Sequence, residues 1–305
     1  MSTSNSSQYA SRFHQGQGFY SFSLGNLTVT SVSDGFLVFD DPQAALAPKA
    51  DSQEFDTILR KKFLSSDTAY THINTLLIEG NGKKVLIDNG CGDSLGPSAG
   101  LLVKHLANAG VKASEIDIVL VSHAHPDHIF GTITRTGEHV FPNAHYMISK
   151  EEWDFWTAPN VKISSPFGDD MARAAILGAQ RHLKAIEDRV SFFDNEQEIM
   201  PGIRAIRAFG HTPGMMAFII TSNRKRLIYT ADALHHFVVT LARPDWELGV
   251  DNDPVEAIVT RMKLLEKITS VEAPLVHVPH FPFPGIGHIR KEHAGYVWEP
   301  VVWEW

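Results

Sequence analysis

Short apolar runs, rich in β-branched residues and bounded by Gly, Pro and Asn, recur along most of the chain. Runs of this length and composition are typical of buried β-strands. The segment Gly80-Asn81-Gly82 joins two of them and predicts a β-hairpin, because an Asn-Gly pair suits a tight turn. The pattern predicts strands at Leu27–Ser33, His72–Glu79, Lys83–Asp88, Ile116–Val121, Ala144–Ser149, Ile203–Phe209, Met216–Thr221, Arg226–Thr230 and Leu275–Val278.

Stretches with apolar residues at helical spacing lie between and after these strands. The clearest begins at Asp253-Pro254-Val255-Glu256, where Asp suits the N-cap and Pro the first helical position. Strands in clusters, with helices between them, favour two sheets packed face to face with helices outside. The predicted helices are Phe55–Phe63, Leu101–Ala109, Lys150–Trp156, Met171–Ile186 and Asp253–Ile268.

Four residues that can bind a metal follow the predicted strand Ile116–Val121 in the segment His123-Ala-His125-Pro-Asp127-His128. His123 and His125 are two residues apart, so at a strand end they project to the same side. Asp127 and His128 follow a turn helped by Pro126 and can point to a second position nearby. Neutral imidazoles and a carboxylate suit zinc and similar divalent metals.

Three further candidate ligands each follow a predicted strand. His211 lies in Gly210-His-Thr-Pro-Gly214, Asp232 in Thr230-Ala-Asp-Ala233, and His280 in Val278-Pro-His280. Small neighbours would let the backbone approach a shared centre. Seven suitable residues in this order favour a metal site over a set of unrelated packed histidines.

The composition of the chain excludes several classes of protein and of metal site. The chain has 305 residues and a net charge of −8, which argues against general nucleic-acid binding. The only cysteine, Cys91, excludes an internal disulfide and a Cys-rich zinc site. No secretory signal and no run long enough to cross a membrane is visible, so we expect a cytoplasmic protein with no membrane partner.

The motifs His123–His128 and Gly210–Gly214, followed by an Asp and a late His after strands, resemble the metallo-β-lactamase fold superfamily. The resemblance covers Leu24 to Trp303 and implies an α/β protein, a four-layer αββα sandwich of two mixed sheets. We therefore expect a flexible arm over 1–20 and a single catalytic domain over 21–305. Three segments are similar to the methyl parathion hydrolase group, whose relatives include lactonases and aryl esterases: Asp88–Gly92, Phe155-Trp156 and Phe283–Arg290.

The resemblance implies a role for each ligand. His123, His125 and His211 would hold one metal, Asp127, His128 and His280 the other, and Asp232 would bridge them. Two divalent ions, zinc first and Mn²⁺, Fe²⁺ or Co²⁺ as alternatives, would share a hydroxide nucleophile, with Asp127 and Asp232 as the carboxylates of the reaction.

Asp88 matches a residue that supports a ligand histidine in the superfamily, although it could instead cap its own turn. Trp156, Phe167 and His236 are candidates for the substrate pocket, and ordinary packing is the alternative for each. His235 could also reach the substrate. Cys91 is expected to be a packed residue, and His72 and His288 are expected to be structural.

These inferences predict a metal-dependent hydrolase of small neutral esters: a lactone, an aryl ester or an organophosphate triester. The alternatives are a sensor that binds a ligand at its metal pocket without turnover, and a β-lactamase or thioesterase of the same fold. The expected partner is a small-molecule ester, and the resemblance adds a homodimer as a candidate assembly.

Overall fold

The computed structural model describes residues 17–270, 274–293 and 295–302. Within them the strands form two mixed sheets, as predicted. The strands are β1 (Phe19–Leu24), β2 (Leu27–Phe39), β3 (Ala69–Gly80), β4 (Lys83–Ile87), β5 (Ile118–Leu120), β6 (His145–Ser149), β7 (Val190–Phe193), β8 (Glu198–Met200), β9 (Ile203–Arg207), β10 (Met216–Ser222), β11 (Lys225–Tyr229), β12 (Leu275–His277), β13 (Ile286–Glu292) and β14 (Gly295–Pro300).

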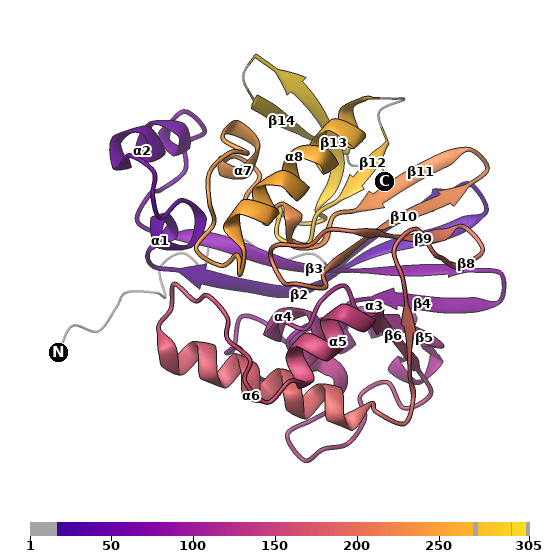
Figure 1. Ribbon diagram of the computed structural model, residues 1–305. Helices are drawn as coiled ribbons and strands as arrows, with labels where there is room; N and C mark the ends of the chain where they lie inside the picture. Colours follow the sequence, from indigo (N-terminus) through magenta and orange to yellow (C-terminus); the bar gives the residue numbers. More distant parts are fainter. Residues whose placement is uncertain (1–16, 271–273, 294, 303–305) are drawn as a thin grey trace.

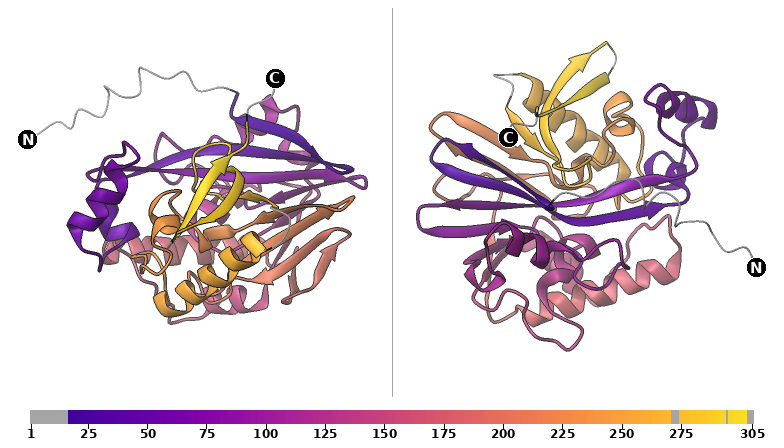
Figure 2. Two further views of the ribbon diagram at one scale, coloured as in Figure 1. Left: turned by 90° about the horizontal axis from the view of Figure 1, so that it is seen from above. Right: turned by 180° about the vertical axis from the view of Figure 1, so that it is seen from behind.

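The two sheets each contain seven strands, in the orders β1 to β7 and β14 to β8. In the first sheet β1–β4 are antiparallel neighbours and β4–β7 are parallel. In the second, β11 and β12 are parallel and the other pairs are antiparallel. The sheets face each other, with one group of helices on each outer side (Figures 1 and 2).

The helices enclose this double sheet. In Figure 1, α3 to α6 lie below it and α7 and α8 above it. No helix of the described segments is long and apolar enough to cross a membrane. The helices are α1 (Pro42–Leu46), α2 (Ser52–Arg60), α3 (Leu102–Asn108), α4 (Pro126–Ile129), α5 (Lys150–Thr157), α6 (Asp169–Ala185), α7 (Val239–Ala242) and α8 (Pro254–Ser270), with 3-10 turns η1 (Ala113–Glu115), η2 (Phe130–Thr132) and η3 (Ala231–Ala233).

Strand β3 shows why the apolar runs are nearly continuous. Leu76 and Ile78 pack between the sheets together with Phe218 of β10. Leu77, on the opposite face, packs beneath the helices with Leu183 of α6. Because both faces of the strand are buried, both sets of alternate positions are apolar.

The structure differs from the predicted elements at both ends of the chain. The predicted arm over 1–20 lies outside the described residues as far as residue 16, but its last residues, Phe19 and Tyr20, already belong to β1. The tail after Phe281, for which no strand was predicted, forms the β13–β14 hairpin. The predicted cap of α8 is present, because the Asp253 side chain accepts from the amides of Val255 and Glu256.

Candidate metal centre

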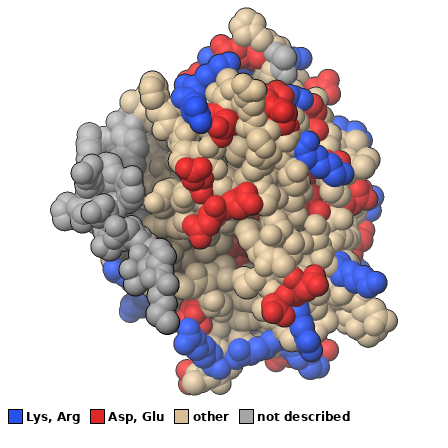
Figure 3. Space-filling model, turned by 90° about the vertical axis from the view of Figure 1, so that its left-hand side faces the viewer, with Lys and Arg blue, Asp and Glu red and all other residues tan. Residues whose placement is uncertain are grey.

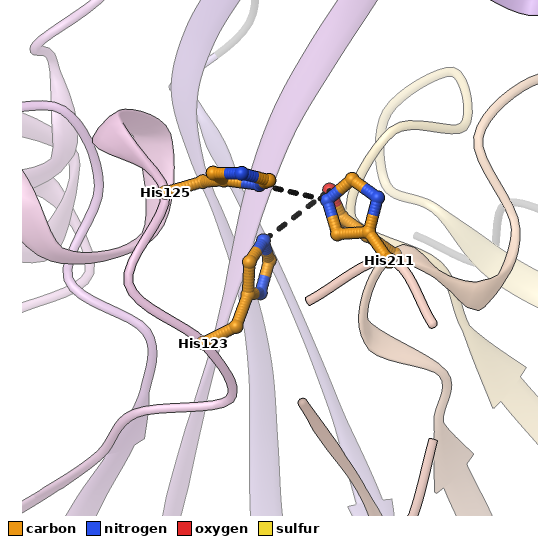
Figure 4. Close-up of side chains that lie close together, drawn as sticks. His123, His125 and His211 are labelled. Carbon is orange, nitrogen blue, oxygen red and sulfur yellow. Dashed lines mark hydrogen bonds and ion pairs between the residues drawn. The ribbon is translucent and has the colours of Figure 1, made fainter. Parts of the chain in front are cut away.

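The segments that follow strands at one edge of the two sheets carry all seven predicted ligands. His123 and His125 follow β5, and Pro126 begins the short helix α4, which carries Asp127 and His128. His211 follows β9, Asp232 lies in η3 after β11, and His280 follows β12. Figure 4 shows the rings of His123, His125 and His211 pointing toward one another from both halves of the chain.

The donor atoms fall into two sets. His123, His125, His211 and Asp232 form one, and Asp127, His128 and His280 form the other; within each set the donors lie within 4.8 Å of one another. Asp232 faces both sets, since its Oδ2 lies 3.3 Å from His211 Nε2 and its Oδ1 lies 3.2 Å from His128 Nε2. The structure thus brings together the two sets and the shared carboxylate that the sequence predicted.

The spacing fits a divalent cation. Ligands about 2.0–2.1 Å from a tetrahedral zinc lie about 3.3 Å apart. Asp232 Oδ2 lies 2.9 Å from His280 Nε2 and 3.6 Å from His123 Nε2, and Asp127 Oδ2 lies 3.5 Å from His128 Nε2. In addition, the buried atoms His123 Nε2, His128 Nε2 and Asp232 Oδ1 form no hydrogen bond within the described residues. Such atoms are costly to bury without a partner, and coordination would satisfy them.

The outer nitrogens of the ligands are held by acceptors. His128 Nδ1 donates to Asp88 Oδ2 over 2.8 Å, His211 Nδ1 to Asp251 over 3.0 Å, and His280 Nδ1 to the His72 carbonyl over 2.7 Å. A proton on Nδ1 leaves the lone pair of a neutral imidazole on Nε2, which faces the centre. Asp88 therefore lies in the supporting position that the sequence suggested, and it also accepts from the Ser122 amide and the Tyr229 hydroxyl.

Glu152 of α5 joins the two ligand-bearing loops and was missed by the sequence reading. Its side chain is fully buried. It accepts from the Ala124 amide and the Trp156 indole through Oε1, and from Thr212 Oγ1 and the Gly214 amide through Oε2. One carboxylate thus ties the loop of His123 and His125 to the loop of His211.

Arg261 of α8 is a second support without a sequence signal. Its side chain is 1% exposed and donates to Asp251 Oδ2 over 3.1 Å. It also donates to the carbonyls of Ala233, beside Asp232, and of Pro244 and Trp246. Arg261 therefore fixes the carboxylate that orients His211 and, at the same time, the turn that carries Asp232.

Burial and the neighbouring charges shift the pKa values of the ligands in different directions. Burial lowers the pKa of the His125 imidazole to about 3. Burial acts in the same direction on His211, but hydrogen bonds to Asp232 and Asp251 outweigh it and raise its pKa to about 9. Burial would raise the pKa of Asp232, yet the surrounding histidines hold it well below its usual value. His211 would have to release its added proton to bind a metal, so metal binding would be coupled to proton release.

The predicted pocket residues are not gathered in one place. Trp156 has no exposed surface; its ring packs edge-on against His125 at 5.5 Å between centroids, behind the ligand, which corrects its predicted place in the pocket wall. His236 uses Nδ1 to accept from the amides of Val238 and Val239 and so caps a turn. Phe167 is 46% exposed and packs on Phe39 at 5.1 Å, so its role in the pocket stays a prediction.

One face of the molecule is hollowed. Figure 3 shows a hollow on the face that is on the left in Figure 1, with acidic side chains around it. The Asp127 side chain is 15% exposed, against 3% for Asp232, so Asp127 is the more accessible of the two carboxylate ligands. A separate cavity of about 590 Å³ contains none of the ligands and is lined by Asp41, Gln43, Ala44, Pro48, Lys49, Ser164, Ser165, Pro166, Glu247, Leu248, Gly249 and Pro254.

Comparison with known proteins agrees with this geometry. Residues 70–280 match the metallo-beta-lactamase superfamily, and the chain belongs to that family. No curated protein matches the sequence.

Several solved structures are similar over nearly the whole chain. AidC, a dizinc quorum-quenching lactonase in complex with the product N-hexanoyl-L-homoserine, is 31% identical, with a TM-score of 0.89 over 94% of this chain and 98% of AidC. The hydrolase AbOPH is 26% identical, with a TM-score of 0.85 over 95% of this chain and 100% of AbOPH. A probable metal-dependent hydrolase from Staphylococcus aureus shares the fold at 17% identity, with a TM-score of 0.75 over 92% of this chain and 100% of the other.

The chain is therefore a metal-dependent hydrolase that resembles lactonases. This follows from its family, from the two donor sets, which are those of a dinuclear centre, and from its similarity to a dizinc lactonase. The predicted fold class and family are confirmed.

Proposed function

We propose that this protein hydrolyses lactones with two bound zinc ions, and that aryl esters and organophosphate triesters are secondary substrates. The observation that carries the proposal is the pair of donor sets joined by Asp232. The similarity to a dizinc lactonase at 31% identity supports both the metal and the lactone. The similarity to the hydrolase AbOPH supports hydrolysis as the type of reaction.

When bound, the metals would supply a water nucleophile of lowered pKa and a Lewis acid for the ester oxygen. The protein supplies the rest. Asp232 would balance the charge of both cations, and Asp88, Asp251 and the His72 carbonyl keep the ligand imidazoles in one tautomer. The partly exposed Asp127 marks the side from which a substrate reaches the centre.

A side-chain nucleophile is not needed for this reaction. Cys91 is fully buried, and burial raises the pKa of its thiol far above the usual value. A thiol in this state is a poor nucleophile. This is the packed role that the sequence suggested for Cys91.

The test is chelation and reconstitution with a substrate panel. Purified protein is analysed for metal, stripped with a chelator, and assayed with N-hexanoyl-homoserine lactone, dihydrocoumarin, 4-nitrophenyl acetate and methyl parathion. We expect turnover to disappear on stripping and to return with two equivalents of zinc, with the lactones hydrolysed most efficiently.

The outcomes separate the alternatives. Turnover that persists after the metal is shown to be gone would refute the metal-dependent mechanism. Full occupancy with no hydrolysis, but with thermal stabilisation by one of these esters, would favour the sensor. Hydrolysis of a β-lactam or a thioester in preference to all four compounds would move the protein to another branch of the superfamily.

A further inference from the structure

His235 lies beside the proposed centre but belongs to neither of the two donor sets that define it. It follows η3 and is 6% exposed. Its ring centroid lies 5.0 Å from that of His211 and 4.8 Å from that of His280. A histidine this deeply placed among metal ligands needs an account of both of its nitrogens.

The backbone decides which nitrogen of His235 carries the proton. Nδ1 lies 3.1 Å from the carbonyl oxygen of Asp232, which can only accept a hydrogen bond. Nδ1 therefore donates, and the lone pair of the neutral ring is on Nε2. This Nε2 lies 3.4 Å from Asp232 Oδ2. A lone pair facing a carboxylate oxygen is unfavourable unless a cation lies between them.

The same arrangement is found in two of the proposed ligands. His211 and His280 also bind an acceptor through Nδ1 and place Nε2 3.3 Å and 2.9 Å from Asp232 Oδ2. The neighbouring His236 is arranged in the opposite way, because its Nδ1 accepts from two backbone amides. His235 is therefore oriented as a ligand and His236 as a structural residue.

We propose that His235 Nε2 is an additional metal ligand, which holds the second cation together with Asp232 and His280. The three donor atoms lie within 4.8 Å of one another and all three residues are buried. His280 is shared with the set of Asp127 and His128, so the added nitrogen acts on the second cation of the proposed dinuclear centre, on which this inference rests. The first cation, held by His123, His125 and His211, keeps its ligands.

The test compares His235→Gln with His235→Glu, two side chains of nearly equal size of which only the carboxylate is a good ligand. His288→Gln is the matched control, since His288 on β13 binds the Pro274 carbonyl and contacts no proposed ligand among the described residues. Cobalt is titrated into stripped protein, and its affinity and visible spectrum are recorded for each equivalent. Circular dichroism of the metal-free variants verifies that they are folded.

We expect His235→Gln to weaken the second cobalt equivalent at least tenfold and to change its spectrum, as loss of a group that contacts the metal shell does. His235→Glu should stay within a few-fold of wild type, and His288→Gln should match it. Wild-type affinity and spectrum in His235→Gln would overturn the proposal, as would equal weakening by Gln and Glu. Failure of the wild-type protein to bind cobalt would instead refute the dinuclear centre itself.

Discussion

Replacing Glu152 by Gln is the sharpest test of how the loops of the centre are held. The carboxylate accepts from the Ala124 amide at 2.9 Å and the Trp156 indole at 2.6 Å through Oε1. Through Oε2 it accepts from Thr212 Oγ1 at 2.7 Å and the Gly214 amide at 3.0 Å. Two of these partners lie in the loop that carries His211.

The size of the expected destabilisation follows from the hydrogen bonds that glutamine cannot accept. Its amide oxygen can replace Oε1, and the Thr212 hydroxyl can turn to accept from the new NH₂ group. The Gly214 amide can only donate and is left buried without a partner, at a cost of about 1–3 kcal/mol. The three remaining bonds lose the contribution of the charge, about 1 kcal/mol each. Burial raises the pKa of Glu152, so removal of the charge offsets part of this loss, and we expect a net destabilisation of about 2–4 kcal/mol.

Two assays test the predicted destabilisation and its effect on zinc binding. Urea denaturation of the stripped protein measures the free energy of unfolding. Competition with a chromophoric chelator measures zinc affinity, which we expect to fall about 10- to 100-fold for the site of His123, His125 and His211. Glu151→Gln is the control, because its exposed ion pair with Arg207 should contribute less than about 1 kcal/mol. A variant of Glu152 that is destabilised yet binds two zinc ions with wild-type affinity would refute the positioning role.

Two further predictions test two other buried side chains. Arg261→Met leaves the buried Asp251 carboxylate unpaired and should lower the free energy of unfolding in urea by about 3–5 kcal/mol. The control Arg290→Met, at an exposed ion pair, should unfold like wild type. A loss below about 1 kcal/mol for Arg261→Met would contradict the network. Burial lowers the pKa of His182 from 6.5 to about 4, so its neutral ring contributes stability above pH 6.5 that is lost as the pH falls toward 4. In the stripped protein, the loss of unfolding free energy between pH 6.5 and pH 4 should therefore be about 3 kcal/mol smaller for His182→Phe than for wild type. Equal losses in the two proteins would show that His182 does not titrate in this way.

The ligands could be predicted from the sequence because each follows a strand end directly. His123, His211 and His280 each come two residues after a predicted apolar run, and the pairing of these strands brings their ends to one edge. The residues that hold the ligands could not be predicted in this way. Glu152 and Arg261 are charged residues on helices, which are almost always exposed. Only the folded chain shows the donors and acceptors around them.

The same contrast holds for the strands: buried strands could be predicted from the sequence, and strands at the sheet edges could not. β3 and β4 are buried over most of their length, so their apolar runs predicted them. β1, β8 and β14 lie at the edges of the sheets and have mixed burial, with no continuous apolar run. Their pairing depends on a neighbouring strand rather than on their own composition. Trp156 was misplaced for a related reason, since its spacing fits the interior as well as a pocket wall.

Three buried carboxylates hold the ligand shell from its outer side. Asp88 binds His128 and Ser122, Glu152 joins the loops after β5 and β9, and Asp251 links His211 to α8. These bonds use the outer side of the ligand shell and leave the inner nitrogens facing Asp232. A site fixed in this way does not have to order its loops when it binds metal, so more of the binding free energy appears as affinity. For the same reason we expect neutral substitutes for Asp88, Glu152 or Asp251 to weaken the site, because each keeps the volume of the side chain but accepts fewer hydrogen bonds.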